Sequence, residues 1–485
     1  MKITDRELLK QAIEKPAITN YLHKETKIIL SDILKAMPND TITFKEKGIT
    51  NHILEAWTWI LQDSVYNLKR CDLREDAHWT TKANYRQQKR NLNQQYVFGL
   101  DRILRYFKDF TEFERVLYGI DGGYRDHVVH VFRVWLLGIV ILYWPNGMTV
   151  QDIEVQDILE DKQVFSEEEI ISMWAIIALC HDLGYPLEMA EKINDSVERM
   201  YRNLGNMNIQ RFSAAFKNEH QYLDEFLLDV ISSKLRPRKN DESYEEILNL
   251  YDSISQATKL NDEIRRVMMN TPMFFTAKQS KYRAKFANSL KQYSHGIISS
   301  SILLKSLFFF LESDFSLQEN NLLSFEDGRQ FLIRREILRS IAAHTCPEIY
   351  HLQTNTLSFL LILCDELQEW GRPRFSDMHN NTKPATEVSI NDVSRQNIEF
   401  ELRYSVANDE EDALARSAFS RWHTILRSAV EDDKRKFKME IKLDINDKVF
   451  KFKFVNNILS TTKGDGKRGV DFPVYEDLFK KIFDA

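Results

Sequence analysis

Apolar residues recur at intervals of three and four along most of the chain, which is typical of helices that bury one face. The spacing is clear in Ile53–Leu61, within a region from residue 1 to about 115 whose connecting segments are mostly polar. From Tyr124 to about Arg374 the helical runs become longer and more apolar, as expected for buried helices. The pattern therefore predicts a mainly α protein.

The C-terminal part of the chain changes from helical to strand periodicity. Apolar and polar residues alternate over residues 398–404, 439–443 and 449–454, and this alternation predicts three strands. The polar segment Asp444–Lys448 joins the last two strands as a hairpin turn. A helical segment over residues 409–431 separates them from the first strand. We therefore expect a small α+β unit at this end.

These patterns divide the chain into four regions. An N-terminal helical region over residues 1–115 precedes a helical domain over residues 116–375, which contains an insertion at about 190–290. Residues 376–396 are rich in Ser, Thr, Asn and Asp and predict a linker. Residues 397–485 form the small α+β domain.

Glycine is scarce, and this scarcity limits the kinds of phosphate site that the chain can build. The 485 residues include 15 glycines, whereas average usage would give roughly 34. Neither glycine-rich pattern of the Rossmann and P-loop enzymes occurs, and the nearest string, Gly464–Gly469, fits neither. A dinucleotide-binding or P-loop enzyme is therefore excluded as an interpretation.

Net charge and cysteine content favour a protein of a reducing compartment. Lys and Arg number 66 against 72 Asp and Glu, a net charge of −6, which gives no indication of nucleic-acid binding, although a local basic groove stays possible. The four cysteines show no disulfide or Cys-x-x-Cys spacing. We read Cys180, Cys346 and Cys364 as small buried apolar residues.

No targeting or membrane segment is expected from the apolar pattern. The first 16 residues are charged throughout and do not form a signal peptide. The longest apolar stretch, Val134–Trp144, has 11 residues, whereas a membrane span needs about 20. We therefore expect a soluble, cytoplasmic protein that does not bind membranes.

One helix delivers chemically active residues at its end. Ser166 and Glu169 form a capping box, and a glycine and a proline follow at the other end, which predicts a helix over residues 167–183. Its second half is almost wholly apolar, and its last turn carries His181 and Asp182. Burying an imidazole beside a carboxylate costs free energy unless something satisfies both groups. A divalent metal ion would do so.

Four further helical segments also present metal-ligand residue types. Their side chains lie at helix starts, at a helix end or on apolar stripes. They are His127 and His130 in one helix, His295 opening a second, His344 ending a third and Asp365 on a fourth.

The order of these residues along the chain resembles a known family. The succession His, His-Asp, His, His, Asp, each on a helix, is similar to the HD-domain superfamily of metal-dependent phosphohydrolases. The segment Ala178–Tyr185 is close to that family's apolar run followed by His-Asp, and the match extends from Arg125 to Arg374. The resemblance implies an HD-type helical bundle with an N-terminal helical extension. Both His127 and His130 satisfy the first motif, His-x-x-[RH]-Val, and we favour His127 as the single ligand.

The chain departs from a compact HD domain in the spacing of its third ligand. Between Asp182 and His295 lie 112 residues. His220 falls within this gap and is an alternative third ligand to His295.

The resemblance implies one or two bound metal ions. Mixed imidazole and carboxylate ligands suit Mn, Fe, Zn, Co or Ni better than Mg or Ca. A single ion would be held by four residues, His127, His181, Asp182 and Asp365. Adding His295 and His344 makes a two-metal site with Asp182 as the bridge. With one metal, His295 or His344 would instead act as general acid, so Asp182, His295 and His344 are the expected catalytic residues.

Three functions are consistent with this ligand pattern. The first is a phosphohydrolase acting on a nucleotide, a cyclic nucleotide or a short oligonucleotide. The second is an HD-type di-iron oxygenase acting on a small polar substrate, and the third is a regulatory or scaffold protein with a vestigial site. The candidate phosphate-binding residues are Arg125, Arg133, Lys305 and Arg372. The terminal regions carry no identified chemistry, and homo-oligomer formation is left open.

Overall fold

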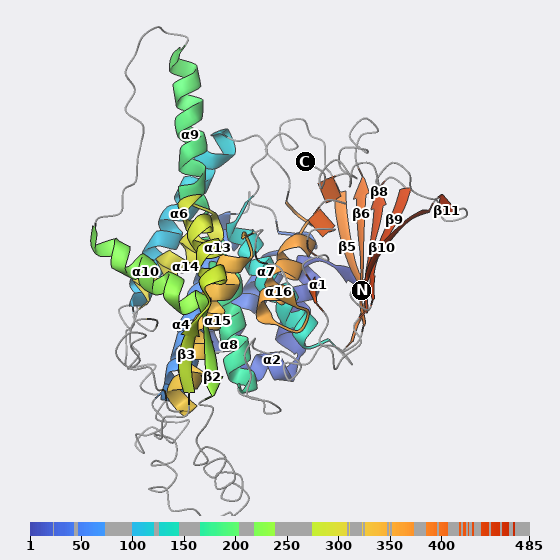
Figure 1. The fold of residues 1–485 in the computed structure, drawn as a ribbon. Helices are drawn as coiled ribbons and strands as arrows, with labels where there is room; N and C mark the ends of the chain where they lie inside the picture. Colours follow the sequence, from blue (N-terminus) through green and yellow to red (C-terminus); the bar gives the residue numbers. More distant parts are fainter. Residues whose placement is uncertain are drawn as a thin grey trace, which may run out of the picture. The chain divides into compact units, whose positions relative to one another are not determined.

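A computed structural model shows a helical body and a single large sheet (Figure 1). The described residues are 1–22, 24–42, 47–72, 99–120, 126–144, 165–202, 218–237, 274–307, 310, 323, 325–346, 349, 352–372, 385–394, 397–405, 417–418, 421–422, 425, 429–430, 438–445, 448–455, 458–464 and 469–470. Helices predominate among them, which confirms the prediction of a mainly α protein. The HD-type arrangement of the helices stays a prediction.

The chain forms two compact units, and each draws on segments that are distant in sequence. The first unit contains Met1–Trp59, Glu114–Ile153 and Tyr350–Ala485. The second contains Ile60–Phe113 and Glu154–Ile349. The predicted boundaries followed changes of periodicity along the chain, whereas this division follows contacts in space.

The first unit is built around α7 (Val128–Leu142), a helix that is buried along its whole length. Among the described residues, the other helices of this unit are α1 (Asp5–Glu14), α2 (Pro16–Tyr21), α3 (Lys24–Ala36), α16 (Leu357–Leu367), the start of α4 (Lys47–Asp72) and the end of α6 (Leu100–Ile120). Both α1 and α16 pack against α7. A helix that is apolar on every side needs such cover on several faces.

Over the described residues, the sheet of the first unit has seven strands in the order β1-β5-β6-β8-β9-β10-β11. Their bounds are β1 (Lys2–Ile3), β5 (Ala385–Val393), β6 (Asn397–Ser405), β8 (Lys438–Ile445), β9 (Lys448–Val455), β10 (Ile458–Gly464) and β11 (Gly469–Val470). β6 and β8 are parallel, and the other neighbouring pairs are antiparallel. A short parallel pair, β4 (Leu352–Gln353) with β7 (Ala429–Val430), lies apart from this sheet. The three predicted strands and the predicted hairpin of β8 and β9 are confirmed.

The two faces of this sheet differ in polarity, as strand periodicity requires. One face buries alternate apolar residues such as Phe400 and Ile441. The other carries ion pairs between neighbouring strands, including Lys442 Nζ with Glu401 Oε1 at 2.8 Å. The hydrogen bond from Lys442 lowers the pKa of Glu401.

The predicted linker over residues 376–396 was wrong over Ala385–Val393, which forms β5. Val388, Ile390 and Val393 are buried, and the polar residues Ser389, Asn391 and Asp392 between them concealed this apolar pattern. Polar composition suggested a connection, but the apolar positions decide the strand. The sheet also extends beyond the predicted unit, because β1 at the N-terminus pairs with β5. The helix predicted over residues 409–431 falls largely outside the described residues, and it was wrong at Ala429–Val430, which forms the strand β7.

The second unit places α14 (His295–Ser306) at its centre. α14 packs against α8 (Glu167–Cys180), α9 (Tyr185–Arg202), α10 (Asn218–Ser232), α13 (Ser280–Lys291) and α15 (Phe325–Ala343). β2 (Ser233–Pro237) and β3 (Phe274–Lys278) form an antiparallel pair within the region predicted as an insertion. Small residues suit α14 to this position, since Ser299, Ser300 and Ser301 are all buried.

The capping box predicted at the start of α8 is present. Ser166 Oγ accepts a hydrogen bond from the backbone N–H of Glu169, and the Glu169 carboxylate accepts one from the N–H of Ser166. The same carboxylate receives two hydrogen bonds from Arg329 of α15, at 2.6 and 2.7 Å. The predicted end at residue 183 was three residues too late, because α8 ends at Cys180 and a turn follows.

Replacing Ser166 with Ala should lower the free energy of unfolding by about 1 kcal/mol, because the start of α8 loses its capping oxygen. Urea unfolding followed by circular dichroism would measure the change. Ser31→Ala in the interior of α3, where the hydroxyl bonds to the Lys27 carbonyl, is the matched control and should change stability by less than about 0.5 kcal/mol. Equal effects of the two substitutions would contradict the capping role.

One segment among the described residues is long and apolar enough to cross a membrane by length and composition. It is Glu167–Ala190, which has 24 residues. Within it, 83% of the most apolar 18-residue stretch is buried in the fold. Such burial is the setting of a core helix, which agrees with a soluble protein. The cytoplasmic location stays a prediction.

Candidate metal centre

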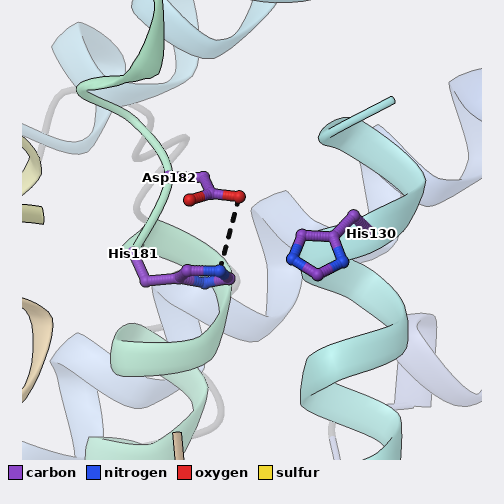
Figure 2. A group of neighbouring side chains, drawn as sticks. All are labelled: His130, His181 and Asp182. Carbon is purple, nitrogen blue, oxygen red and sulfur yellow. Dashed lines mark ion pairs between the residues drawn. The ribbon is translucent and has the colours of Figure 1, made fainter. Parts of the chain in front are cut away.

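The turn after α8 places a histidine and an aspartate side by side in the second unit. His181 is the C-cap of α8, and both His181 and Asp182 are buried. The His181 Nε2 atom lies 3.4 Å from Asp182 Oδ2 (Figure 2). We call this pair the Oδ2 subsite.

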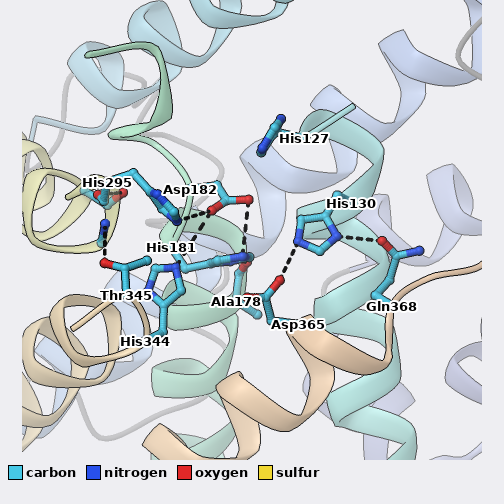
Figure 3. Close-up of polar contacts among 12 residues, drawn as sticks. His127, His130, Ala178, His181, Asp182, His295, His344, Thr345, Asp365 and Gln368 are labelled. Atoms are coloured by element: carbon cyan, nitrogen blue, oxygen red, sulfur yellow. Dashed lines mark hydrogen bonds and ion pairs between the residues drawn. The ribbon is translucent and has the colours of Figure 1, made fainter. Parts of the chain in front are cut away.

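The other oxygen of Asp182 faces two more histidines of the same unit. Asp182 Oδ1 lies 3.4 Å from His295 Nε2 and 3.9 Å from His344 Nε2 (Figure 3). The three residues offer ligand atoms that all lie within 4.8 Å of one another. We call this group the Oδ1 subsite. The single carboxylate of Asp182 therefore serves two sets of imidazoles, as the predicted bridging role requires.

Hydrogen bonds to backbone carbonyls determine which nitrogen of two of these histidines carries a proton. The Nδ1 atom of His181 lies 2.9 Å from the Ala178 carbonyl, and that of His344 lies 2.6 Å from the Ile341 carbonyl. A carbonyl oxygen only accepts hydrogen bonds, so Nδ1–H donates in both rings. In the neutral rings the lone pair of Nε2 then points at the Asp182 carboxylate.

His295 has a charged partner at the same position. Its Nδ1 donates to Glu188 Oε2 at 2.7 Å, and its backbone N–H donates to the same oxygen at 2.8 Å. Its Nε2 therefore also presents a lone pair to Asp182. Lone pairs facing carboxylate oxygens repel one another unless a cation or a proton lies between them, so this donor set fits a divalent metal ion.

Close packing fixes the turn that carries Asp182. The Gly184 N–H donates to Ser299 Oγ at 2.7 Å, and the Ser299 hydroxyl donates to the His295 carbonyl at 2.8 Å. On the other side, the Tyr106 hydroxyl donates to the Leu183 carbonyl at 2.6 Å. The sequence indicated Gly184 only as a stop signal for the helix, whereas the structure shows that it allows α14 to approach the turn.

Replacing Gly184 with Ala should disturb both stability and metal binding. Its Cβ would lie 2.3 Å from the His295 carbonyl oxygen, so α14 must move away from the turn. We expect a loss of about 1–3 kcal/mol in the free energy of unfolding, together with weaker cobalt binding measured by calorimetry. Gly48→Ala, where nothing lies within 4 Å of the new Cβ, is the control, and unchanged cobalt affinity in Gly184→Ala would contradict this packing role.

The first unit holds a second arrangement of histidine and aspartate. His130 Nε2 of α7 lies 2.9 Å from Asp365 Oδ1 of α16, and His130 Nδ1 lies 2.6 Å from Gln368 Oε1. Gln368 Nε2 donates to the Trp370 carbonyl at 2.8 Å, which fixes the orientation of the amide. His130 Nδ1 is therefore the donor, and its Nε2 faces a carboxylate as in the second unit.

His127 lies against a different carboxylate. It is the N-cap residue of α7, its backbone N–H donates to Glu114 Oε1, and its Nδ1 lies 3.8 Å from the same oxygen. Among the described contacts, the ring that meets Asp365 is that of His130. Within the first unit, His130 is therefore the histidine of α7 that reaches α16, and His127 as the ligand stays a prediction.

Arg133 has a structural setting instead of the expected phosphate-binding one. Its guanidinium is buried and donates to both carboxylate oxygens of Asp5 at 2.8 Å. It also donates to the carbonyls of Ile42 and Gly371. These hydrogen bonds use the guanidinium inside the fold. Arg133 therefore links α1 to α7 and does not have the expected phosphate-binding role.

The other expected phosphate partners are placed as follows. Lys305 Nζ lies 2.8 Å from Asp224 Oδ1, in an ion pair between α14 and α10. Arg372 donates to the Asp126 carbonyl at 3.2 Å. Arg125 lies outside the described residues. Phosphate binding by Arg125, Lys305 and Arg372 stays a prediction.

The sequence offered His220 as an alternative to His295. Among the described side chains, His295 is the histidine that lies between His181 and His344 in sequence and faces Asp182, whereas the side chain of His220 lies outside the described set.

Burial raises the pKa of the Cys180 and Cys364 thiols. Protonated thiols are poor metal ligands, in agreement with the apolar role expected for these cysteines.

Two polar residues of these clusters were not found by the sequence reasoning. Glu188 and Gln368 hold the Nδ1 atoms of His295 and His130. Glu188 follows Asp182 by six residues and shows no distinguishing spacing, and Gln368 lies just beyond the end of α16.

Compared with known proteins, the chain matches no family model, no curated protein and no solved structure.

Proposed function

We propose that the protein is a metal-dependent phosphohydrolase that acts on a nucleotide, a cyclic nucleotide or a short oligonucleotide. The observation that carries this proposal is the division of the Asp182 carboxylate between two sets of histidines. Oδ2 faces His181, and Oδ1 faces His295 and His344. Such a division is what two neighbouring metal ions require of a bridging carboxylate.

The mixed imidazole and carboxylate donors favour Mn, Fe, Zn, Co or Ni. We further propose that His130 and Asp365 complete the ligand set. This part of the proposal rests on the order of the residues along the chain, and on the contact between His130 Nε2 and Asp365 Oδ1 inside the first unit.

When bound, divalent metal ions lower the pKa of coordinated water to about 7 and stabilise charge on a phosphoryl group. The role of Asp182 would be to hold two ions at a fixed separation. The roles of His181, His295 and His344 would be to present neutral Nε2 donors, since their Nδ1–H groups are already engaged. With a single ion, His295 or His344 would instead be protonated on Nε2 as well as on Nδ1, and would donate the Nε2 proton to the leaving oxygen.

The test is an activity screen of metal-stripped protein reloaded with Mn, Mg, Co or Fe. The substrates are dNTPs, NTPs, cyclic nucleotides and short oligonucleotides. The proposal predicts release of phosphate or nucleotide with a transition metal, and its loss in the double variant His181→Ala with Asp182→Ala. Oxygen-dependent turnover with firmly bound iron and no hydrolysis would instead indicate the di-iron oxygenase. Unchanged metal content in the double variant, without any activity, would indicate a regulatory or scaffold protein.

A further inference from the structure

His295 differs from the other histidines around Asp182 in the partner of its Nδ1 atom. His181 and His344 donate from Nδ1 to neutral backbone carbonyls. His295 donates to the carboxylate of Glu188 at 2.7 Å. Because a carboxylate withdraws the Nδ1 proton more strongly than a carbonyl does, it increases the donor strength of Nε2.

Two residues of α9 hold the His295 ring from neighbouring positions. Glu188 Oε2 receives both the ring Nδ1–H and the backbone N–H of His295. The ring of Tyr185, one turn earlier, lies edge-on with its centroid 5.6 Å from that of His295. The imidazole is therefore fixed in direction as well as in tautomer, with its Nε2 facing Asp182 Oδ1.

We infer that Glu188 is a positioning residue that sets the metal affinity of the Oδ1 subsite. This inference rests on the proposed metal-binding function of the cluster. Glu188 acts on the cluster through His295, whose Nε2 faces Asp182 Oδ1, whereas His181 faces Oδ2. Its removal should therefore weaken one metal position and leave the other nearly unchanged.

The test is a titration of the metal-stripped full chain with cobalt, followed by its visible absorption and by calorimetry. The wild-type protein should bind two cobalt ions. In Glu188→Ala, the affinity of one ion should fall by about 10- to 100-fold and that of the other should stay unchanged. Glu188→Gln keeps an accepting oxygen but loses the charge, so its affinity for that ion should lie between those of the wild type and Glu188→Ala. Glu225→Gln, which removes a carboxylate paired with Arg283, is the control and should behave as the wild type.

The outcomes separate this inference from the proposed function. Two-ion binding with the same affinities in Glu188→Ala would overturn the role of Glu188 and leave the metal centre standing. Equal weakening of both ions, or weakening that merely follows a lowered melting temperature, would overturn it as well. A wild-type protein that binds no cobalt would overturn both the proposed function and the inference.

Discussion

Asp182→Asn should abolish metal-dependent hydrolysis and empty both metal positions. The two oxygens of Asp182 face different histidines, and an amide offers one neutral oxygen in their place. We expect a fall in the hydrolysis rate of about 1,000-fold or more, which corresponds to about 4 kcal/mol of transition-state stabilisation. Metal analysis after dialysis and rates of phosphate release would measure the two effects.

The matched control for this substitution is Asp101→Asn. Asp101 pairs with Arg105 one turn later on α6, and the Arg105 side chain is 73% exposed. Its loss should leave the metal content and the hydrolysis rate unchanged. Asp182→Asn protein that keeps two metal ions and wild-type turnover would show that the carboxylate is not the bridge.

Arg133→Met should destabilise the protein by about 3–5 kcal/mol, because it leaves the Asp5 carboxylate buried without its cation. Asp5 is fully buried and accepts further hydrogen bonds from the Trp370 indole at 2.9 Å and the Ile42 N–H at 2.6 Å. The group joins α1 to α7 and to the segment after α16. Urea unfolding of the variant would measure the loss.

The exposed ion pair of Arg105 again supplies a control. Arg105→Met should cost less than about 1 kcal/mol, since exposed pairs contribute little. The double variant Asp5→Leu with Arg133→Met should recover part of the loss, because no unpaired charge is then buried. An Arg133→Met protein with wild-type stability and a raised KM would restore the phosphate-binding role that the sequence suggested.

Gly371 adds a backbone requirement to this buried group. Its φ is +68°, and a Cβ would lie 2.5 Å from the Thr41 side chain and 2.6 Å from the Arg133 guanidinium. A side chain at this position therefore does not fit beside Arg133.

Local signals in the sequence predicted the elements that depend on neighbouring residues. The capping box of Ser166 and Glu169 predicted the start of α8, and strict alternation predicted β6, β8 and β9. These features arise from hydrogen bonds and burial patterns within a few residues. The same local order placed His181 and Asp182 at the end of an apolar helix.

Pairings between distant residues were not predictable from those signals. The choice between His127 and His130 depends on which ring meets Asp365, more than 200 residues later. The role of Arg133 depends on Asp5 from the other end of the unit. Glu188 acquires its significance only because α9 and α14 pack together. Side chains of ordinary composition can thus hold special positions that spacing alone does not mark.

The central claim is that metal held around Asp182 makes the protein a phosphohydrolase. The most direct test is to titrate metal-stripped protein with manganese while measuring the hydrolysis of bis(p-nitrophenyl) phosphate. We predict no hydrolysis without metal, a rise to a plateau at two equivalents, and no rise in Asp182→Asn. Full hydrolysis by the metal-stripped protein, or tight manganese binding with no hydrolysis of this ester or of any nucleotide, would contradict the claim.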